Sequence, residues 1–267
     1  MIDSREDQAA GLRRLFRRTP PTVVAVYATG RNHMCTTVQT AYRIAGQSER
    51  VLILDEAPGE GALAGVFDLP PGPDLLSVLG GRVGARALVQ PIPGLMGRVP
   101  VAAAALALPL LDDERRGVLV AALRELQRHA GFVLIHSQGE AATDPSPFIF
   151  AAPRRLVVAE ASRSGATEAY QIIKRLAAAG AGSLHVAVAR ARDRAEANAF
   201  FTGLNSLVRR HIGVPLAWLG EVERDDLAHG LACEAAAASP RGAEAAFLRR
   251  LEALARGVAP PRAAGAR

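Results

Sequence analysis

The chain contains 267 residues, of which 49% are hydrophobic and 22% are charged, so it can bury a core and is not a disordered protein. Its formal charge is +6, but arginine is not interleaved with aromatic residues that stack on bases, so we expect no nucleic-acid partner. Cys35 and Cys233 lie far apart and no signal peptide is recognised, which argues against a disulfide framework or a metal site and favours a cytoplasmic protein.

Residues 1–18 are predicted to form a short amino-terminal helix. Ser4 and Asp7 have the spacing of a capping box at its start. An apolar stripe with helical spacing follows, made of Leu12, Leu15 and Phe16. Arginines flank this stripe, and residues 19–22 contain two consecutive prolines, which end the helix and form a short stiff spacer.

Strands and helices are predicted to alternate from residue 23 to residue 257. The candidate buried strands are Val23–Tyr27, Val51–Asp55, Phe132–His136, Arg155–Glu160, Leu184–Ala189 and Leu216–Leu219. The candidate helices between them are Thr36–Gln47, Asp112–Ala130, Ser164–Ala178 and Asp193–His211. This alternation is typical of a doubly wound α/β fold, a mainly parallel sheet with helices on both faces and its ligands at the carboxyl ends of the strands. Residues 258–267 are predicted to be a disordered tail.

The turn after the first strand, Ala28 to Cys35, stands where such a fold places a phosphate-binding loop. A loop of that kind needs glycines for close backbone approach, a lysine for the terminal phosphates and a Ser or Thr for magnesium. Here Cys35 stands at the lysine position and bulky residues fill the middle of the turn. The remnant of a nucleotide site would consist of Gly30, Arg31, Cys35, Thr36, Thr37 and Asp55. The alternative for Thr36 is a hydroxyl that caps the helix.

A last helix is predicted over Ala243 to Arg256. Its apolar residues are Phe247, Leu248, Leu251 and Leu254, with arginines beside them. An amphipathic helix with this composition either contacts an anionic membrane surface or closes the core of its own domain. The first alternative would place the protein at the periphery of the inner membrane.

Two groups of residues resemble FlhG, the MinD-like regulator of flagellar number and placement within the MinD/ParA family of P-loop ATPases. The segment Asp7-Gln8-Ala9-Ala10-Gly11-Leu12-Arg13 is similar to the family's amino-terminal D-Q-A-x-x-L-R motif. The segment Thr167-Glu168-Ala169-Tyr170-Gln171-Ile172-Ile173-Lys174 is similar to its T-D-A-Y-x-x-I-K helix. The resemblance covers roughly Asp7 to Arg256 and implies a MinD-like fold.

The departures from the family concern the nucleotide site. The family loop reads K-G-G-V-G-K-T, and its two lysines fall on Gly30 and Cys35. The second acid of its D-A-D element falls on Ala57, and the acid of its D-T-G-A-G element falls on His136. The asparagine that reads adenine after Val188 is replaced. Too little charge remains to balance a triphosphate, so we expect a pseudo-ATPase without a cofactor; ATP with Mg²⁺ is the family's alternative.

The resemblance also implies a partner. In FlhG the amino-terminal helix binds FlhF, a signal-recognition-type GTPase, and stimulates its GTP hydrolysis. Carried over to this chain, Asp7 and Gln8 would approach the partner's nucleotide. The apolar stripe would seat the helix in a groove, and Arg13 would pair with the partner surface. The resemblance further implies contacts with components of the flagellar basal body.

Three alternatives stay open. The amino-terminal helix packs on the surface of its own domain, as amphipathic helices usually do. The chain is an ATP-dependent switch of the MinD/ParA type with an unorthodox phosphate loop. The chain is a MinD-like accessory protein of another positioning or secretion system, which would have no reason to carry the amino-terminal motif.

Overall fold

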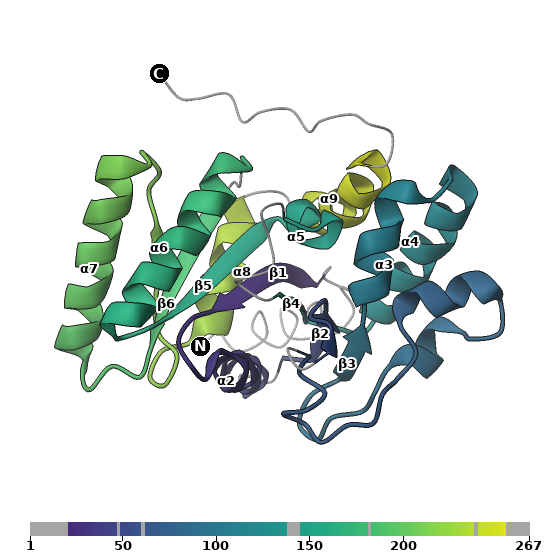
Figure 1. The fold of residues 1–267 in the computed structure, drawn as a ribbon, viewed down its shortest axis with the longest axis horizontal. Helices are drawn as coiled ribbons and strands as arrows, with labels where there is room; N and C mark the ends of the chain where they lie inside the picture. The colour runs from purple at the N-terminus through teal and green to yellow at the C-terminus, as the bar shows by residue number, and fades with distance from the viewer. Residues whose placement is uncertain are drawn as a thin grey trace, which may run out of the picture.

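The computed structural model describes residues 21–46, 49–59, 62–137, 145–180, 183–237 and 240–254. The predicted amino-terminal helix and the carboxy-terminal tail lie outside these residues. The described part forms a seven-stranded sheet in the order β3-β2-β4-β1-β5-β6-β7 (Figure 1). All pairings between these strands are parallel, which confirms the predicted doubly wound α/β fold.

Six of the seven strands overlap with predicted ones, and the last of them, predicted over Leu216–Leu219, lies at Ala217–Glu221. The strands are β1 Thr22–Ala28, β2 Val51–Asp55, β3 Gly97–Pro100, β4 Phe132–His136, β5 Arg154–Glu160, β6 Ser183–Ala189 and β7 Ala217–Glu221. Their burial is nearly continuous along β1, β2, β4, β5 and β6, because helices cover both faces of a parallel sheet. The strand that was not predicted is β3, which lies at one edge of the sheet and is also largely buried.

Helices connect the strands and carry their own start signals. They are α2 His33–Ala45, α3 Ala102–Ala107, α4 Asp113–Gln127, α5 Pro147–Ala151, α6 Arg163–Ala178, α7 Arg194–His211, α8 Leu227–Ala237 and α9 Pro240–Leu254. Short 3₁₀ turns lie at Leu75–Gly80, Ala85–Leu88 and Leu108–Leu110. The side chains of Asp112, Ser162 and Asp193 accept hydrogen bonds from the first turns of α4, α6 and α7, as helix caps do.

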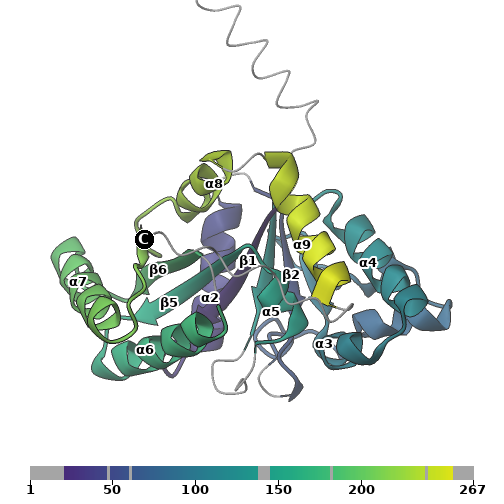
Figure 2. The ribbon, with the colours of Figure 1, turned by 90° about the horizontal axis from the view of Figure 1, so that it is seen from above.

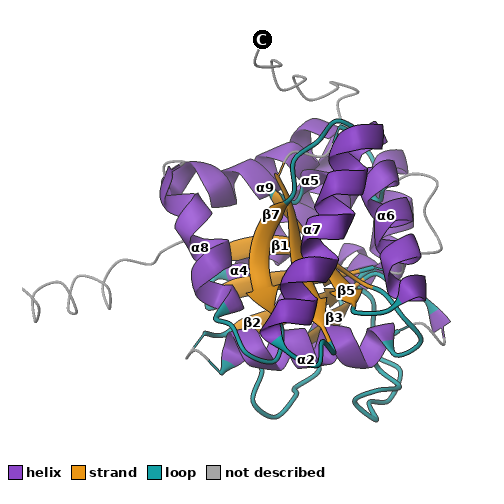
Figure 3. Cartoon of the chain, turned by 90° about the vertical axis from the view of Figure 1, so that its left-hand side faces the viewer, coloured by secondary structure: helices purple, strands orange, loops and turns teal. Residues whose placement is uncertain are grey.

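Helices lie on both faces of the sheet (Figures 2 and 3), and the sheet separates two apolar cores. Alternate residues of each strand point to opposite faces, so Val23, Ala25 and Tyr27 join the larger core with residues of α4, α5, α6, α7 and α9. Val24, Val26 and Ala28 join the smaller core with residues of α2 and α8. In Figure 2, α9 lies beside α5 and α4, with which it is in contact.

The last helix belongs to the larger core. Phe247, Leu248 and Leu251 are 0%, 4% and 0% exposed, so these side chains are not available to a lipid surface, and the predicted membrane contact is wrong for them. The alternative, a helix that closes the core, describes them correctly. The side chain of Leu254 lies outside the described part. None of the described helices is long and apolar enough to cross a bilayer.

Candidate functional site

The loop after β1 is short. Strand β1 ends at Ala28 and α2 begins at His33, three residues before the predicted start at Thr36. The Thr36 amide donates to the Asn32 carbonyl at 2.9 Å, and the His33 amide donates to the Gly30 carbonyl at 3.2 Å. Backbone amides that would face a phosphate in such a loop therefore take part in internal hydrogen bonds.

Gly30 is the turning point of this loop and is bound to an acid of the chain itself. Its φ of 88° lies in the left-handed region that glycine adopts without strain. Its amide donates to the Glu168 carboxylate of α6 at 2.7 Å. A Cβ on Gly30 would lie 2.3 Å from Oε2 of Glu160, the last residue of β5. Two carboxylates thus lie at the position that the family gives to a lysine, and they would repel an incoming phosphate.

These two acids come from elements that the sequence analysis did not connect with the loop. The Glu160 amide donates to Thr29 Oγ1 at 3.0 Å, which ties β5 to the end of β1. Arg190 Nη1 lies 4.0 Å from Glu160 Oε2, at the distance limit of an ion pair. Glu168 falls inside the segment that resembles the family's T-D-A-Y helix. That it is an acid was the only feature of the sequence that could have pointed to its contact with Gly30.

The two threonines at the start of α2 are both buried, at 1% exposure. Thr37 Oγ1 donates to the His33 carbonyl at 3.1 Å. Thr36 Oγ1 has no hydrogen-bond partner among the described residues, so it does not cap the helix as the alternative for this residue supposed. Asn32 holds the cap position without a side-chain hydrogen bond. In contrast, Arg31 and Cys35 are exposed, and the Cys35 thiol is free.

Asp55, the remaining acid of the D-A-D element, belongs to a buried ion pair. Its side chain is 0% exposed, and Oδ2 lies 2.6 Å from Nε of Arg98 on β3. It also accepts hydrogen bonds from the amides of Ala57 at 3.2 Å and Leu63 at 2.8 Å. Because these donors occupy the carboxylate, it is not free to hold magnesium. The described residues contain no group of three or more His, Cys, Asp or Glu side chains suited to a metal ion.

Glu56, the next residue, is a site acid that the sequence analysis missed. Its carboxyl accepts a hydrogen bond from the Ser146 hydroxyl. Burial raises its pKa to about 8, although the hydrogen bond from Ser146 lowers it, and the nearby charge of Asp55 adds to the rise. Burial, followed by the charge of Glu56, also raises the pKa of Tyr27 on β1. An acid directly after a buried strand was the signal that could have identified it.

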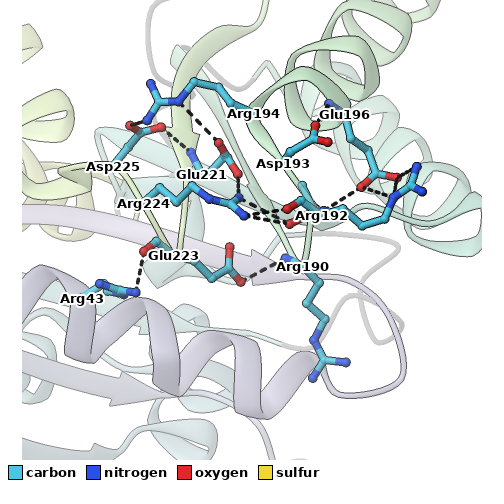
Figure 4. A network of polar contacts seen from close by, with 11 residues as sticks. Arg43, Arg190, Arg192, Asp193, Arg194, Glu196, Glu221, Glu223, Arg224 and Asp225 are labelled. Carbon is cyan, nitrogen blue, oxygen red and sulfur yellow. Dashed lines mark hydrogen bonds and ion pairs between the residues drawn. The ribbon is translucent and has the colours of Figure 1, made fainter.

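The carboxyl ends of β6 and β7 are closed by a network of ion pairs (Figure 4). Its members are Arg43, Arg190, Arg192, Asp193, Arg194, Glu196, Glu221, Glu223, Arg224 and Asp225. The fully buried Glu221 pairs with Arg224, which also donates to the Arg192 carbonyl at 2.9 Å. The Arg190 amide donates to Glu223 Oε1 at 3.0 Å, and Arg43 of α2 donates to the Glu223 carbonyl. The segments after β6 and β7 are thus joined to each other and to α2.

The residues present do not fit ATP with magnesium. The loop amide of Gly30 is bound to Glu168, the Asp55 carboxylate is bound to Arg98, and Glu56 favours its neutral form at neutral pH. The buried Thr36 hydroxyl has no hydrogen-bond partner among the described residues, but a single hydroxyl does not make a magnesium site. The predicted partner-binding residues, Asp7, Gln8, Leu12, Arg13, Leu15 and Phe16, lie outside the described residues.

Comparison with known proteins identifies the fold. No protein-family model matches the chain, and a search of curated proteins found no match. Among solved structures, the MinC:MinD cell division protein complex of Aquifex aeolicus matches with a TM-score of 0.50 and 20% identity, covering 90% of this chain and 97% of that chain. A ParA family ATPase from Chlorobium tepidum matches with a TM-score of 0.51 and 14% identity, covering 87% and 98%. The chain therefore has a MinD/ParA-like P-loop NTPase fold.

Proposed function

We propose that the chain is a pseudo-ATPase with a MinD/ParA-like body and that it regulates flagellar number and placement in the manner of FlhG. The observation that supports the loss of ATP chemistry is the hydrogen bond from the Gly30 amide to the Glu168 carboxylate. An acid of the chain takes the amide that a phosphate would need, and Glu160 adds a second negative charge.

The working part in this proposal is the amino-terminal segment, residues 1–18. It stimulates an FlhF-like GTPase, with Asp7 and Gln8 directed to the partner's nucleotide and the stripe of Leu12, Leu15 and Phe16 held in a groove. The support is the motif that resembles FlhG, which precedes β1. The body then serves as a scaffold. Its fold is compatible with this role, since a structure of the same fold is a complex of MinD with MinC.

The decisive experiment adds a peptide of residues 1–20 to a purified FlhF-like GTPase and follows GTP turnover. We expect the peptide to accelerate hydrolysis, and the Gln8→Ala peptide to lose most of that acceleration. The matched control is Arg18→Ala, which leaves the motif intact. If neither the peptide nor the full chain accelerates turnover, or if the Gln8→Ala peptide is as effective as the original, the assigned partner mechanism is wrong.

One observation favours a second candidate, an ATP-dependent switch. The Thr36 hydroxyl is buried without a hydrogen-bond partner among the described residues, and a magnesium ion would satisfy it. This candidate requires Glu168 and Glu160 to leave the loop when nucleotide arrives. Magnesium-dependent binding of ATP by the purified chain would support it.

A further inference from the structure

Helix α2 carries an apolar flank that the described residues cover only in part. Met34, Val38 and Tyr42 follow one another at intervals of four residues, so they form a stripe along the helix. Phe67 and Leu95 are partly buried against the same core as Met34 and Val38, and the rings of Tyr42 and Phe67 meet edge to face at 6.5 Å. Tyr42 is 39% exposed. We call these five residues the α2 patch.

The topology brings the start of the described chain to one end of this patch. Strands β1 and β2 are parallel members of one sheet, so α2 must return the chain from the carboxyl edge to the amino edge. Its last residue, Ala45, therefore lies at the same edge as Pro21, where β1 is about to begin. Residues 19–21 span at most about 10 Å, so the segment before them is tethered within that distance of the edge of the sheet at which α2 ends.

The amino-terminal segment has the complementary pattern. Phe16 and Leu12 are four residues apart, as are Tyr42 and Val38 on α2, and four residues of helix rise by about 6 Å. If the predicted helix runs parallel to α2, Phe16 lies at the level of Tyr42 and Leu12 at the level of Val38. Gln8 then lies at the level of Met34. Asp7 approaches the exposed Arg31 of the loop after β1, which adds opposite charges at that end.

We propose that residues 4–18 of this chain dock on the α2 patch of the same molecule. This segment suits the patch because its tether begins at the edge of the sheet where α2 ends and because its stripe has the same spacing as the stripe on α2. The docking itself needs no partner. Only its consequence rests on the proposed function: a stripe bound to α2 is not free to enter a groove of an FlhF-like GTPase, so the two contacts compete.

The docking is testable by crosslinking of cysteines at positions that the register brings together. The exposed thiol of Cys35, next to Met34, serves as one site, and Gln8→Cys supplies the other in a Cys233→Ala background. A short bismaleimide should join them within one molecule. Adding Leu12→Asp and Phe16→Asp keeps the tether and its length but removes the stripe. We expect this pair of changes to slow the crosslinking by about tenfold or more, because a segment that is docked most of the time would become mostly undocked.

Two further variants separate the patch from other surfaces. Val38→Asp, on the patch, should slow the reaction as strongly as the changes in the segment, and its unfolding transition reports whether the body is intact. Leu106→Ser with Leu110→Ser should leave the rate unchanged, although these two leucines are 80% and 87% exposed. Equal crosslinking with and without the stripe, or slowing by the Leu106 and Leu110 changes instead of Val38→Asp, would overturn the proposal.

A dilution series decides between one molecule and two. Crosslinking within one chain proceeds at a rate that does not depend on protein concentration, which is the expected result. A rate that rises with concentration would assign the contact to a second copy and refute docking within the molecule. The GTP turnover experiment with the free peptide does not involve the α2 patch, so its outcome is independent of this one.

Discussion

Asp55 and Glu56 are adjacent at the end of β2, and alternation along the strand directs their side chains to opposite faces of the sheet. The buried Asp55 carboxylate has a cation beside it, since Arg98 Nε lies 2.6 Å away, and a buried carboxylate needs such a partner. The carboxyl of Glu56 accepts a hydrogen bond from the Ser146 hydroxyl, and burial raises its pKa, which favours the neutral form. Two adjacent acids thus lie in different electrostatic surroundings.

The pKa of Glu56 makes the stability of the protein depend on pH. Because the folded-state pKa is about 8 and the ordinary value is 4.5, the folded state holds the proton more tightly than the unfolded state. The stability that protonated Glu56 contributes is fully present below pH 4.5, decreases as the pH rises toward 8, and is lost above pH 8. The slope is at most about 1.4 kcal/mol per pH unit for one proton.

Urea unfolding between pH 5.5 and 8.5 measures this effect. The Glu56→Gln variant keeps a hydrogen-bond acceptor for Ser146 and cannot ionise, so its free energy of unfolding should vary less with pH than that of the original chain. The difference between the two chains cancels the titration of all other groups that they share. Parallel curves over the whole range would show that Glu56 ionises normally.

At the scale of secondary structure, one carboxylate organises two helical starts. Asp74 accepts a hydrogen bond from the Leu76 amide at 2.9 Å, at the beginning of the turn Leu75–Gly80. It also accepts hydrogen bonds from the amides of Ala103 and Ala104 at 3.0 Å, in the first turn of α3. Amides at a helix start otherwise lack partners, so Asp74 fixes α3 relative to the 3₁₀ turn.

Asp74→Ala should therefore cost more stability than an ordinary loss of a cap. We expect a decrease in the free energy of unfolding of about 2 kcal/mol or more, against about 1 kcal/mol for Asp112→Ala. Asp112 is the matched control, because among the described residues its side chain caps α4 alone: it accepts a hydrogen bond from the Arg115 amide, and its ion pair with the Arg115 side chain at 3.7 Å is exposed and therefore weak. Denaturant unfolding of both variants provides the comparison. Equal losses would mean that the contacts with α3 contribute nothing.

The elements with a continuous apolar pattern were predictable, and those that depend on distant contacts were not. Strands β2 and β4 have the predicted bounds because each is a buried run of five residues. The edge strand β3 contains Gly97, Arg98 and Pro100, which argue against a strand. Its arginine is buried only because Asp55, 43 residues away, neutralises it, and no local pattern reveals that contact.

The candidate site was predictable in its place but not in its chemistry. The alternation of strands and helices predicts the turn after β1. A turn of this kind needs a residue in the left-handed region, and Gly30 is that residue. The partner of Gly30, Glu168, lies 138 residues further along the chain. Which of the 26 acids reaches the loop depends on how α6 packs on the sheet, and this packing is a property of the whole fold.

On the scale of the molecule, the carboxyl edge of the sheet is held by contacts between elements that are distant in sequence. Glu168 of α6 reaches the loop after β1, and Arg43 of α2 reaches the segment after β7. Glu221 and Arg224 join that segment to the one after β6. The edge where folds of this class bind ligands is thus stabilised by the protein's own side chains.

A thermal unfolding experiment tests this arrangement. We expect ATP with magnesium at millimolar concentration to leave the Tm unchanged, since a ligand present at 100 times its Kd would add about 2.7 kcal/mol and raise the Tm by several degrees. The variant Glu160→Gln with Glu168→Gln removes both negative charges while keeping the shape of the side chains. If the original chain is stabilised by ATP as strongly as that variant, the two acids do not exclude nucleotide.

The hydrogen bond between the Gly30 amide and the Glu168 carboxylate joins two groups of the same chain. A bound metabolite leaves when its supply falls, but a carboxylate attached to the same chain stays at a fixed effective concentration. If the chain is the pseudo-ATPase proposed above, a fall in the cell's nucleotide pool releases nothing from this loop. In that case, a change in the amount of the protein is the means by which a cell adjusts its output.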